Sequence, residues 1–124
     1  MNPLRFATCV LLLLGAFSAP AHAQSVTFAA AQTTVGSGLT DPYGVAMDGA
    51  GDVFIADTDN NRVVEVPAGG GAQITVGSGL SYPFGVAVDG AGDVFIVENY
   101  ASTVVKVPAG GGAQTTVGSG LYLP

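Results

Sequence analysis

Residues 32–72 have the sequence QTTVGSGLTDPYGVAMDGAGDVFIADTDNNRVVEVPAGGGA, and residues 73–113 repeat it without a gap. Thirteen of the 41 positions differ between the two stretches, and 28 are identical. A third copy starts at Gln114 and runs to Pro124. Self-similarity at a fixed period of this length is typical of repeat folds such as solenoids and propellers. The sequence therefore predicts stacked structural units, with two whole repeats and part of a third at residues 114–124.

Each repeat contains four short apolar segments separated by clusters of turn-forming residues. The predicted strands are residues 44–48, 53–57, 62–66 and 72–76 in the first repeat, and 86–89, 94–98, 104–107 and 113–117 in the second. Strands at this spacing are typical of antiparallel sheets in which successive strands pair, and no window shows a helical period. We predict an all-β fold of four-stranded antiparallel blades, about two and a half in number, which form an incomplete β-propeller.

The second strand of each repeat indicates how the blades pack. Residues 53–56 and 94–97 are apolar at every position, with no alternation of polar residues. Such a strand is predicted to be buried on both faces, as it is in a propeller, where each blade lies between two others. Gly44 and Gly85, each with an alanine two positions later, suit a crowded innermost strand.

Residues 1–23 have the features of a signal peptide. A short basic start precedes an apolar run, and Ala21-His22-Ala23 fits a small-x-small cleavage site. The run is shorter than the roughly 20 residues that span a bilayer, so a cleaved signal is favoured over an uncleaved anchor. We expect a secreted or periplasmic protein whose mature part, residues 24–124, is the repeat domain, with residues 26–28 as an extra strand.

Cleavage would leave a mature chain without cysteine or histidine, because Cys9 and His22 are the only ones. The mature chain would contain two basic residues, Arg62 and Lys106, and nine acidic ones. Phosphate backbones and anionic membranes are bound mainly through Lys and Arg. We therefore expect no disulfide and no cofactor, and neither nucleic acid nor a membrane as a partner.

Three blocks of the first repeat form a known pattern. Residues 42–48 read Pro-Tyr-Gly-Val-Ala-Met-Asp, residues 51–57 read Gly-Asp-Val-Phe-Ile-Ala-Asp, and residues 60–63 read Asn-Asn-Arg-Val. These blocks resemble the NHL repeat, although the second repeat has Ala-Ser-Thr at residues 101–103 in place of Asn-Asn-Arg. The chain is also similar to the extracellular NHL domains of bacterial receptor kinases and, more distantly, to streptogramin lyases. The resemblance implies a propeller, commonly of six blades.

The number of blades leaves two explanations open. Propellers close with about four to eight blades, so this chain needs further blades or a homo-oligomer to cover its apolar faces. Either the chain is a fragment of a longer repeat array, which its end within the third repeat favours, or identical chains assemble head to tail. Three chains would then close a six-blade ring that resembles some small lectins.

The turn between the second and third strands is where the repeats diverge most, and we predict that it carries specific recognition. The candidate binding residues are Asp57, Asp59, Asn60, Asn61, Arg62, Glu98, Asn99 and Tyr100. A local ion pair with Asp57 or Asp59 is the favoured role of Arg62. Carboxylates at strand ends, Asp48 among them, would bind a cation if they converged. Because such residues usually accept hydrogen bonds from turn amides, no metal site is predicted.

Aromatic residues near the loops divide into two pairs. Tyr43 and Phe84 are equivalent in the repeat and are expected to pack between blades. Tyr82 and Tyr100 replace aspartates of the first repeat and are better candidates for surface contacts.

We expect a secreted binding or scaffold module that is not an enzyme, with a protein, small-molecule or glycan ligand. No catalytic residue is predicted, because the recurring serines Ser37, Ser78 and Ser119 have no base beside them and are linker residues. Two alternatives remain. The chain is part of a streptogramin-lyase-like propeller enzyme whose catalytic residues lie outside it, or it is a self-assembling lectin-like propeller.

Overall fold

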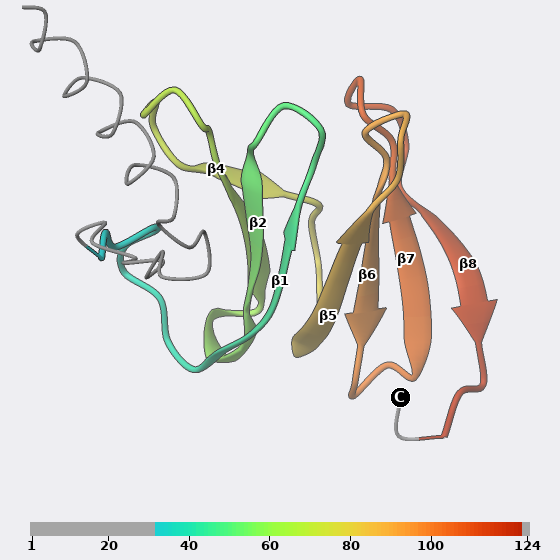
Figure 1. The fold of residues 1–124 in the computed structure, drawn as a ribbon. Coiled ribbons are helices and arrows are strands. Elements are labelled where there is room, and N and C mark those ends of the chain that lie inside the picture. The colour runs from blue at the N-terminus through green and yellow to red at the C-terminus, as the bar shows by residue number, and fades with distance from the viewer. Residues whose placement is uncertain (1–31, 123–124) are drawn as a thin grey trace, which may run out of the picture. The chain divides into compact units, whose positions relative to one another are not determined.

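The computed structural model describes residues 32–122, which form two four-stranded antiparallel sheets (Figure 1). Blade 1 contains β1 (Pro42–Met47), β2 (Val53–Asp57), β3 (Arg62–Val66) and β4 (Ile74–Val76). Blade 2 contains β5 (Pro83–Val88), β6 (Val94–Glu98), β7 (Thr103–Val107) and β8 (Thr115–Ser119). In both sheets the strands pair in chain order. The predicted signal peptide and the predicted strand at residues 26–28 lie outside the described residues.

The predicted strand bounds agree best in the middle of each blade, where β2, β3 and β6 are as predicted. The first strands begin earlier than predicted, because Pro42 pairs with Asp57 and Pro83 pairs with Glu98, each followed by an irregularity in register. Proline has no amide to donate, but it is tolerated at the first position of a strand. The fourth strands begin later than predicted, after the glycine-rich turns.

The turn between β2 and β3 contains a short 3₁₀ helix, η2 (Thr58–Asn60), which the sequence did not indicate. It ends at Asn61, whose φ of 53° lies in the left-handed region that asparagine enters more readily than most residues. Ser102, the equivalent residue of blade 2, also has a φ of 53°. Within residues 32–122, no helix has the length and apolar character needed to cross a membrane.

The two blades pack against each other through their first strands. β1 lies against β5, and a Cβ added to Gly44 would lie 2.6 Å from the backbone oxygen of Phe84. This approach requires glycine, because any side chain would meet backbone. A single apolar core then joins the blades and consists of Phe54, Ala56, Val63, Leu80, Val94 and Ile96.

Burial of the second strands agrees with prediction in one blade only. In β2, Phe54 and Ile55 point to opposite faces and are 4% and 7% exposed, so burial on both faces is confirmed. In β6, Ile96 is fully buried, but Phe95 and Val97 on the other face are half-buried. The prediction is wrong for β6 because, within the described residues, no blade covers the face of Phe95 and Val97. The outer face of β2 also lacks a blade, but Ile55 there lies against the segment of Gly36 and Leu39.

Candidate binding site at the turn end of the blades

At one end of both blades, the second strand turns into the third. We call this the turn end: residues 58–61 and 99–102, with Asp41 and Tyr82 just before the first strands. We call the segments before the first strands, residues 36–41 and 77–82, the linkers. The amide of Asp59 donates to the carbonyl of Thr40 at 3.2 Å in blade 1, and the amide of Asn99 donates to the carbonyl of Tyr82 at 3.1 Å in blade 2, so each linker is hydrogen-bonded to its turn. Eight of the thirteen differences between the repeats fall here or at the residues immediately flanking it. The turn end is therefore the variable part of a constant scaffold.

Asp57 is fully buried at the end of β2, and both of its carboxylate oxygens are engaged. One oxygen accepts a hydrogen bond from the amide of Thr40 at 2.6 Å. The other accepts from Nδ2 of Asn60 at 2.9 Å and from Nε of Arg62 at 2.6 Å. A buried carboxylate is tolerated when it is paired and hydrogen-bonded. Asp57 therefore fastens the linker and the turn to the strand.

The hydrogen bonds to Asp57 also set its protonation state. Burial by itself would raise the pKa of Asp57, but the hydrogen bonds from Thr40, Asn60 and Arg62 and the charge of Arg62 together hold the pKa below its usual value. The predicted ion pair of Arg62 is thus confirmed. Its Nη2 also donates to the carbonyl of Gly38 at 3.0 Å, so this side chain bridges strand and linker.

Glu98 occupies the position of Asp57 in blade 2, where no cation accompanies it. Its carboxylate accepts hydrogen bonds from the amide of Ser81 at 2.7 Å and from the hydroxyl of Thr103 at 2.9 Å. The longer glutamate with a neutral partner therefore holds the second linker as Asp57 and Arg62 hold the first.

Two side chains of the blade 1 turn reach across to blade 2. The buried hydroxyl of Thr58 donates to the carbonyl of Pro83 at 2.7 Å, and Oδ1 of Asn61 accepts from the amide of Tyr82 at 2.7 Å. We call these two hydrogen bonds the inter-blade staple. Asn61, predicted as a binding residue, therefore contributes to blade packing.

Three of the predicted site residues at the turn end have at least partly exposed side chains that make no hydrogen bond among the described residues. Asp59 is exposed, Asn99 is half-buried and the side chain of Tyr100 is 74% exposed. Among residues 32–122, no hydrogen bond engages any of these three side chains. They are the predicted residues best placed to contact a ligand.

Tyr100 stacks on Tyr82, with ring centroids 4.5 Å apart and 24° between the ring planes. Blade 1 has Asp59 and Asp41 at the same two positions. Burial raises the pKa of Tyr82, and the charges of Asp59, of the ionised hydroxyl of Tyr100 and of Asp41 raise it further. The turn end therefore presents a tyrosine pair beside two carboxylates.

The other aromatic pair has the predicted role. Tyr43 on β1 stacks on Phe84 on β5, with ring centroids 4.3 Å apart. These rings join the two blades beside the close approach at Gly44.

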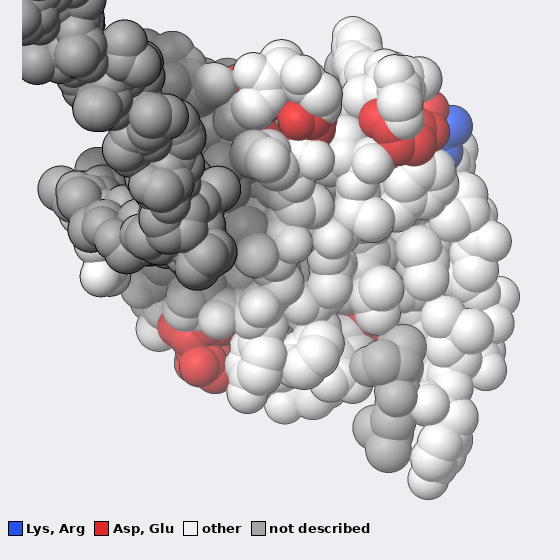
Figure 2. Space-filling model, in the orientation of Figure 1, with Lys and Arg blue, Asp and Glu red and all other residues white. Residues whose placement is uncertain are grey.

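The carboxylates considered as cation ligands do not converge, and Figure 2 shows acidic side chains at both ends of the blades. Because β1 and β2 are antiparallel, Asp48 lies at the opposite end of blade 1 from Asp57, and the same holds for Asp89 and Glu98 in blade 2. Asp48 and Asp89 each accept hydrogen bonds from two amides of their own turns at 2.9 Å. Within the described part of the chain, no cluster of three acidic, histidine or cysteine side chains is arranged to hold a metal ion.

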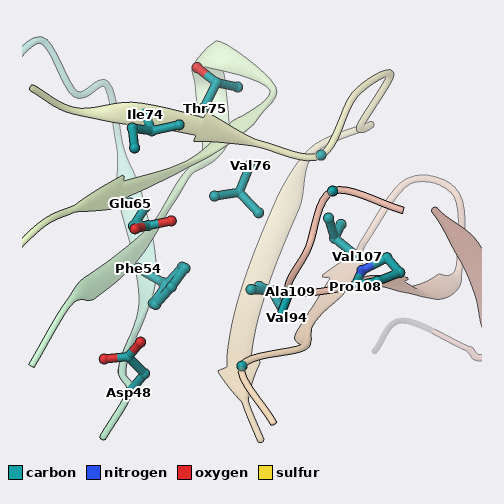
Figure 3. Close-up of a pocket in the computed structure, with 13 residues that line it drawn as sticks. Asp48, Phe54, Glu65, Ile74, Thr75, Val76, Val94, Val107, Pro108 and Ala109 are labelled. Atoms are coloured by element: carbon teal, nitrogen blue, oxygen red, sulfur yellow. The ribbon is translucent and has the colours of Figure 1, made fainter. Parts of the chain in front are cut away.

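A cavity of about 490 Å³ between the two blades was not predicted (Figure 3). Phe54 and Val94 contribute apolar walls from the two blades, and Glu65 and Asp48 contribute carboxylates. Burial raises the pKa of Glu65, and the nearby charges of Asp52 and Asp48 raise it further.

One difference between the repeats concerns a residue that lines this cavity. The position of Glu65 is taken in blade 2 by Lys106, whose Nζ lies 2.6 Å from Oδ2 of Asp93 and 5.7 Å from the ring centroid of Phe95. Blade 1 keeps the equivalent aspartate and phenylalanine but has a carboxylate in place of the ammonium group. Glu65 of blade 1 and Lys106 of blade 2 therefore have opposite charges at the same repeat position. Prediction of strands from apolar segments does not use this difference.

Residues 39–65 match the NHL repeat family, and no curated protein matches the chain. Similar solved structures include a streptogramin B lyase, with a TM-score of 0.55 and 22% identity over 60% of this chain and 25% of that one. The PQQ-bound aldose sugar dehydrogenase of Streptomyces coelicolor has a TM-score of 0.59 and 25% identity over 75% and 34%. The virginiamycin B lyase of Staphylococcus aureus has a TM-score of 0.52 and 18% identity over 60% and 26%.

All three of these neighbours are enzymes, and this overturns the expectation that the chain is not one. That expectation rested on the absence of histidine and cysteine from the predicted mature chain. The chain spans about a quarter to a third of the length of these neighbours, so its own composition does not determine what a whole propeller can catalyse. The predicted similarity to streptogramin lyases is confirmed at the level of the fold. The two sheets are blades of a partial β-propeller, and residues 39–65 of blade 1 match the NHL repeat model.

Proposed function

We propose that this chain is a two-blade recognition module of a secreted propeller, which binds its ligand at the turn end through Tyr82, Tyr100 and Asp59. The observation that carries this proposal is the exchange of two aspartates for two stacked tyrosines at equivalent positions of the turn end. Asp41 and Tyr82 have φ values of 52° and 55°, so the backbone at this one position has the same left-handed conformation in both blades. The two blades therefore present different surface chemistry from equivalent positions.

The chemistry of the turn end suits a ligand with both a flat apolar face and hydrogen-bond donors. The exposed ring of Tyr100 offers an aromatic face that is already held in place by Tyr82. An ionised carboxylate such as that of Asp59 only accepts hydrogen bonds. Sugar rings, and protein side chains that combine an apolar stem with a donor, have this combination of groups. The ligand is therefore a glycan or a protein segment.

Arrays of immobilised glycans and of peptides test this proposal with three proteins: wild type, Tyr100→Ala and Ile74→Ala. Ile74 is 51% exposed and is the control, since it pairs with Glu65 at the opposite end of blade 1. Loss of an aromatic anchor at a binding site costs more than about tenfold in affinity. We expect Tyr100→Ala to lose the spots that wild type binds and Ile74→Ala to keep them. Equal binding by wild type and Tyr100→Ala would contradict the proposal.

Secretion is the other part of the proposed function, and the sequence of residues 1–23 supports it. Mass spectrometry of the exported protein should find Gln24 at its N-terminus. Retention of residues 1–23 on the purified protein would contradict it.

A second candidate function follows from the solved neighbours, which are lyases and a dehydrogenase. In this case the two blades belong to a propeller enzyme whose catalytic residues lie on other blades. Turnover of a streptogramin B antibiotic, or of an aldose with added PQQ, by the exported protein would favour this candidate. Ligand binding without turnover of either substrate would favour the recognition module.

A further inference from the structure

The packing between the blades uses one face of each. Blade 1 contributes what we call a rear face, made of Phe54, Ala56, Val63 and Val76. Blade 2 contributes a front face, made of Leu80, Val86, Val88, Val94, Ile96 and Val107. The 41-residue offset assigns the same two faces to the other sides of the pair. The rear face of blade 2 is Phe95, Val97, Val104 and Val117, and the front face of blade 1 is Leu39, Val45, Met47, Val53, Ile55 and Val66.

These outer faces keep the residues of the inner ones. Eight of the ten positions are identical, and the other two exchange one apolar residue for another. Three of them are exposed where their inner equivalents are half-buried: Val45 and Met47 are 66% and 67% exposed, and Val117 is 53% exposed. Ile55, by contrast, is only 7% exposed. The outer faces therefore have the same apolar residues that pack together between the two blades.

The residues equivalent to those of the inter-blade staple could form the same two hydrogen bonds with another blade. Asn99 replaces Thr58 and still offers a donor, and Ser102 replaces Asn61 and still offers an acceptor. The backbone groups equivalent to those of Pro83 and Tyr82 are the carbonyl of Pro42 and the amide of Asp41. Pro42 is exposed, whereas Pro83 is fully buried by blade 1.

Gly85 gives the most specific indication. Its equivalent, Gly44, must be glycine because blade 2 approaches it to within 2.6 Å of an added Cβ. Within the described residues, a Cβ on Gly85 would meet only the side chain of Val97, at an ordinary 3.4 Å. The fold of one chain therefore does not need glycine at this position, but a further blade packed as blade 2 packs on blade 1 would.

We propose that the front face of blade 1 in one copy of this chain docks head to tail on the rear face of blade 2 in another copy. Gly85 then lies against the carbonyl of Tyr43 in the second copy, and Asn99 and Ser102 staple to Pro42 and Asp41. Such contacts between unlike faces close into rings when the rotation permits. With the two described blades of each copy, a propeller of about four to eight blades is a ring of about two to four copies.

Light scattering on the exported full chain tests the docking by measuring its mass in solution. We expect a single species at a whole multiple of the monomer mass. Gly85→Ala should reduce it to a folded monomer, because the added Cβ would collide with backbone in the docked copy only. Gly90→Ala is the matched control, since a Cβ there meets nothing within 4 Å, and it should keep the wild-type mass.

Val117→Lys is a second variant that guards against misfolding of Gly85→Ala. Its side chain is more than half exposed in one chain, so the lysine is tolerated there, but docking would bury its charge. It should also give a folded monomer by circular dichroism and light scattering. A monomeric wild type, which includes the case in which residues before 32 cover the front face, would overturn the proposal. So would a wild-type mass for both folded variants.

Discussion

The buried carboxylate of Asp57 stabilises the turn end, because it accepts hydrogen bonds from Thr40, Asn60 and Arg62. Its pKa lies below the unfolded value, so its contribution is present above about pH 4 and is lost as the pH falls through the lower folded pKa. We expect Asp57→Asn to lower the free energy of unfolding at pH 7 by about 2 kcal/mol, because hydrogen bonds to a charged group are the stronger kind. The difference from wild type should shrink below about pH 4.

Urea unfolding at a series of pH values measures this difference. Asp59→Asn is the control, because the side chain of Asp59 is exposed and has no hydrogen bond among the described residues. It should unfold as wild type does at every pH. A loss for Asp57→Asn that does not change between pH 7 and pH 3 would show that the charge is not the source of the effect.

Glu65 is a residue whose environment favours a positive charge. Its pKa is raised, so its ionisation above that pKa opposes folding, and the opposition disappears as the pH falls. Glu65→Lys would recreate the contact that Lys106 makes with Asp93 and Phe95, using Asp52 and Phe54. We expect Tm at pH 7 to rise by a few degrees, roughly what one surface ion pair provides.

Calorimetry of Glu65→Lys beside Glu65→Gln separates the two contributions to this rise. The glutamine variant removes the repulsion but adds no ion pair, so its Tm should lie between those of wild type and the lysine variant. A lysine variant no more stable than the glutamine variant would rule out the ion pair.

At the scale of the elements, the approach of β1 to β5 at Gly44 determines how the blades pack. We expect Gly44→Ala to destabilise the chain by about 2 kcal/mol or more, because the added Cβ meets backbone, which cannot rotate away. Gly90→Ala has the same change of composition in open space and should have little effect on unfolding by urea. Equal stabilities for the two variants would mean that the blades do not approach as described.

The elements are also where sequence was most informative. Apolar segments and turn residues predicted all eight described strands, because a short apolar run and a glycine-rich turn are local properties of the chain. The same signals missed the early start at Pro42 and the burial difference between β2 and β6, which depend on neighbours in space. At the turn end, sequence identified the variable positions. It also indicated the ion pair of Arg62 with Asp57. It could not indicate that Asn60, Asn61 and Glu98 are engaged in internal hydrogen bonds, because their partners lie up to 22 residues away.

At the scale of the whole molecule, two repeats that are each too small to bury both faces of a sheet form one core between them. Phe54 and Ala56 of β2 lie at the centre of that core with Val94 and Ile96 of β6. The turn end is then a rim on a rigid base, and the outer faces are positions for further blades.

Hydrogen exchange followed by mass spectrometry tests the shared core most directly. Buried, hydrogen-bonded strands exchange only by large-scale opening. We predict that the amides of β2 and β6 exchange slowest and at similar rates, and that Gly44→Ala accelerates both while Gly90→Ala accelerates neither. Independent rates for the two strands, with β6 unchanged in Gly44→Ala, would contradict the packing of the two blades into one core.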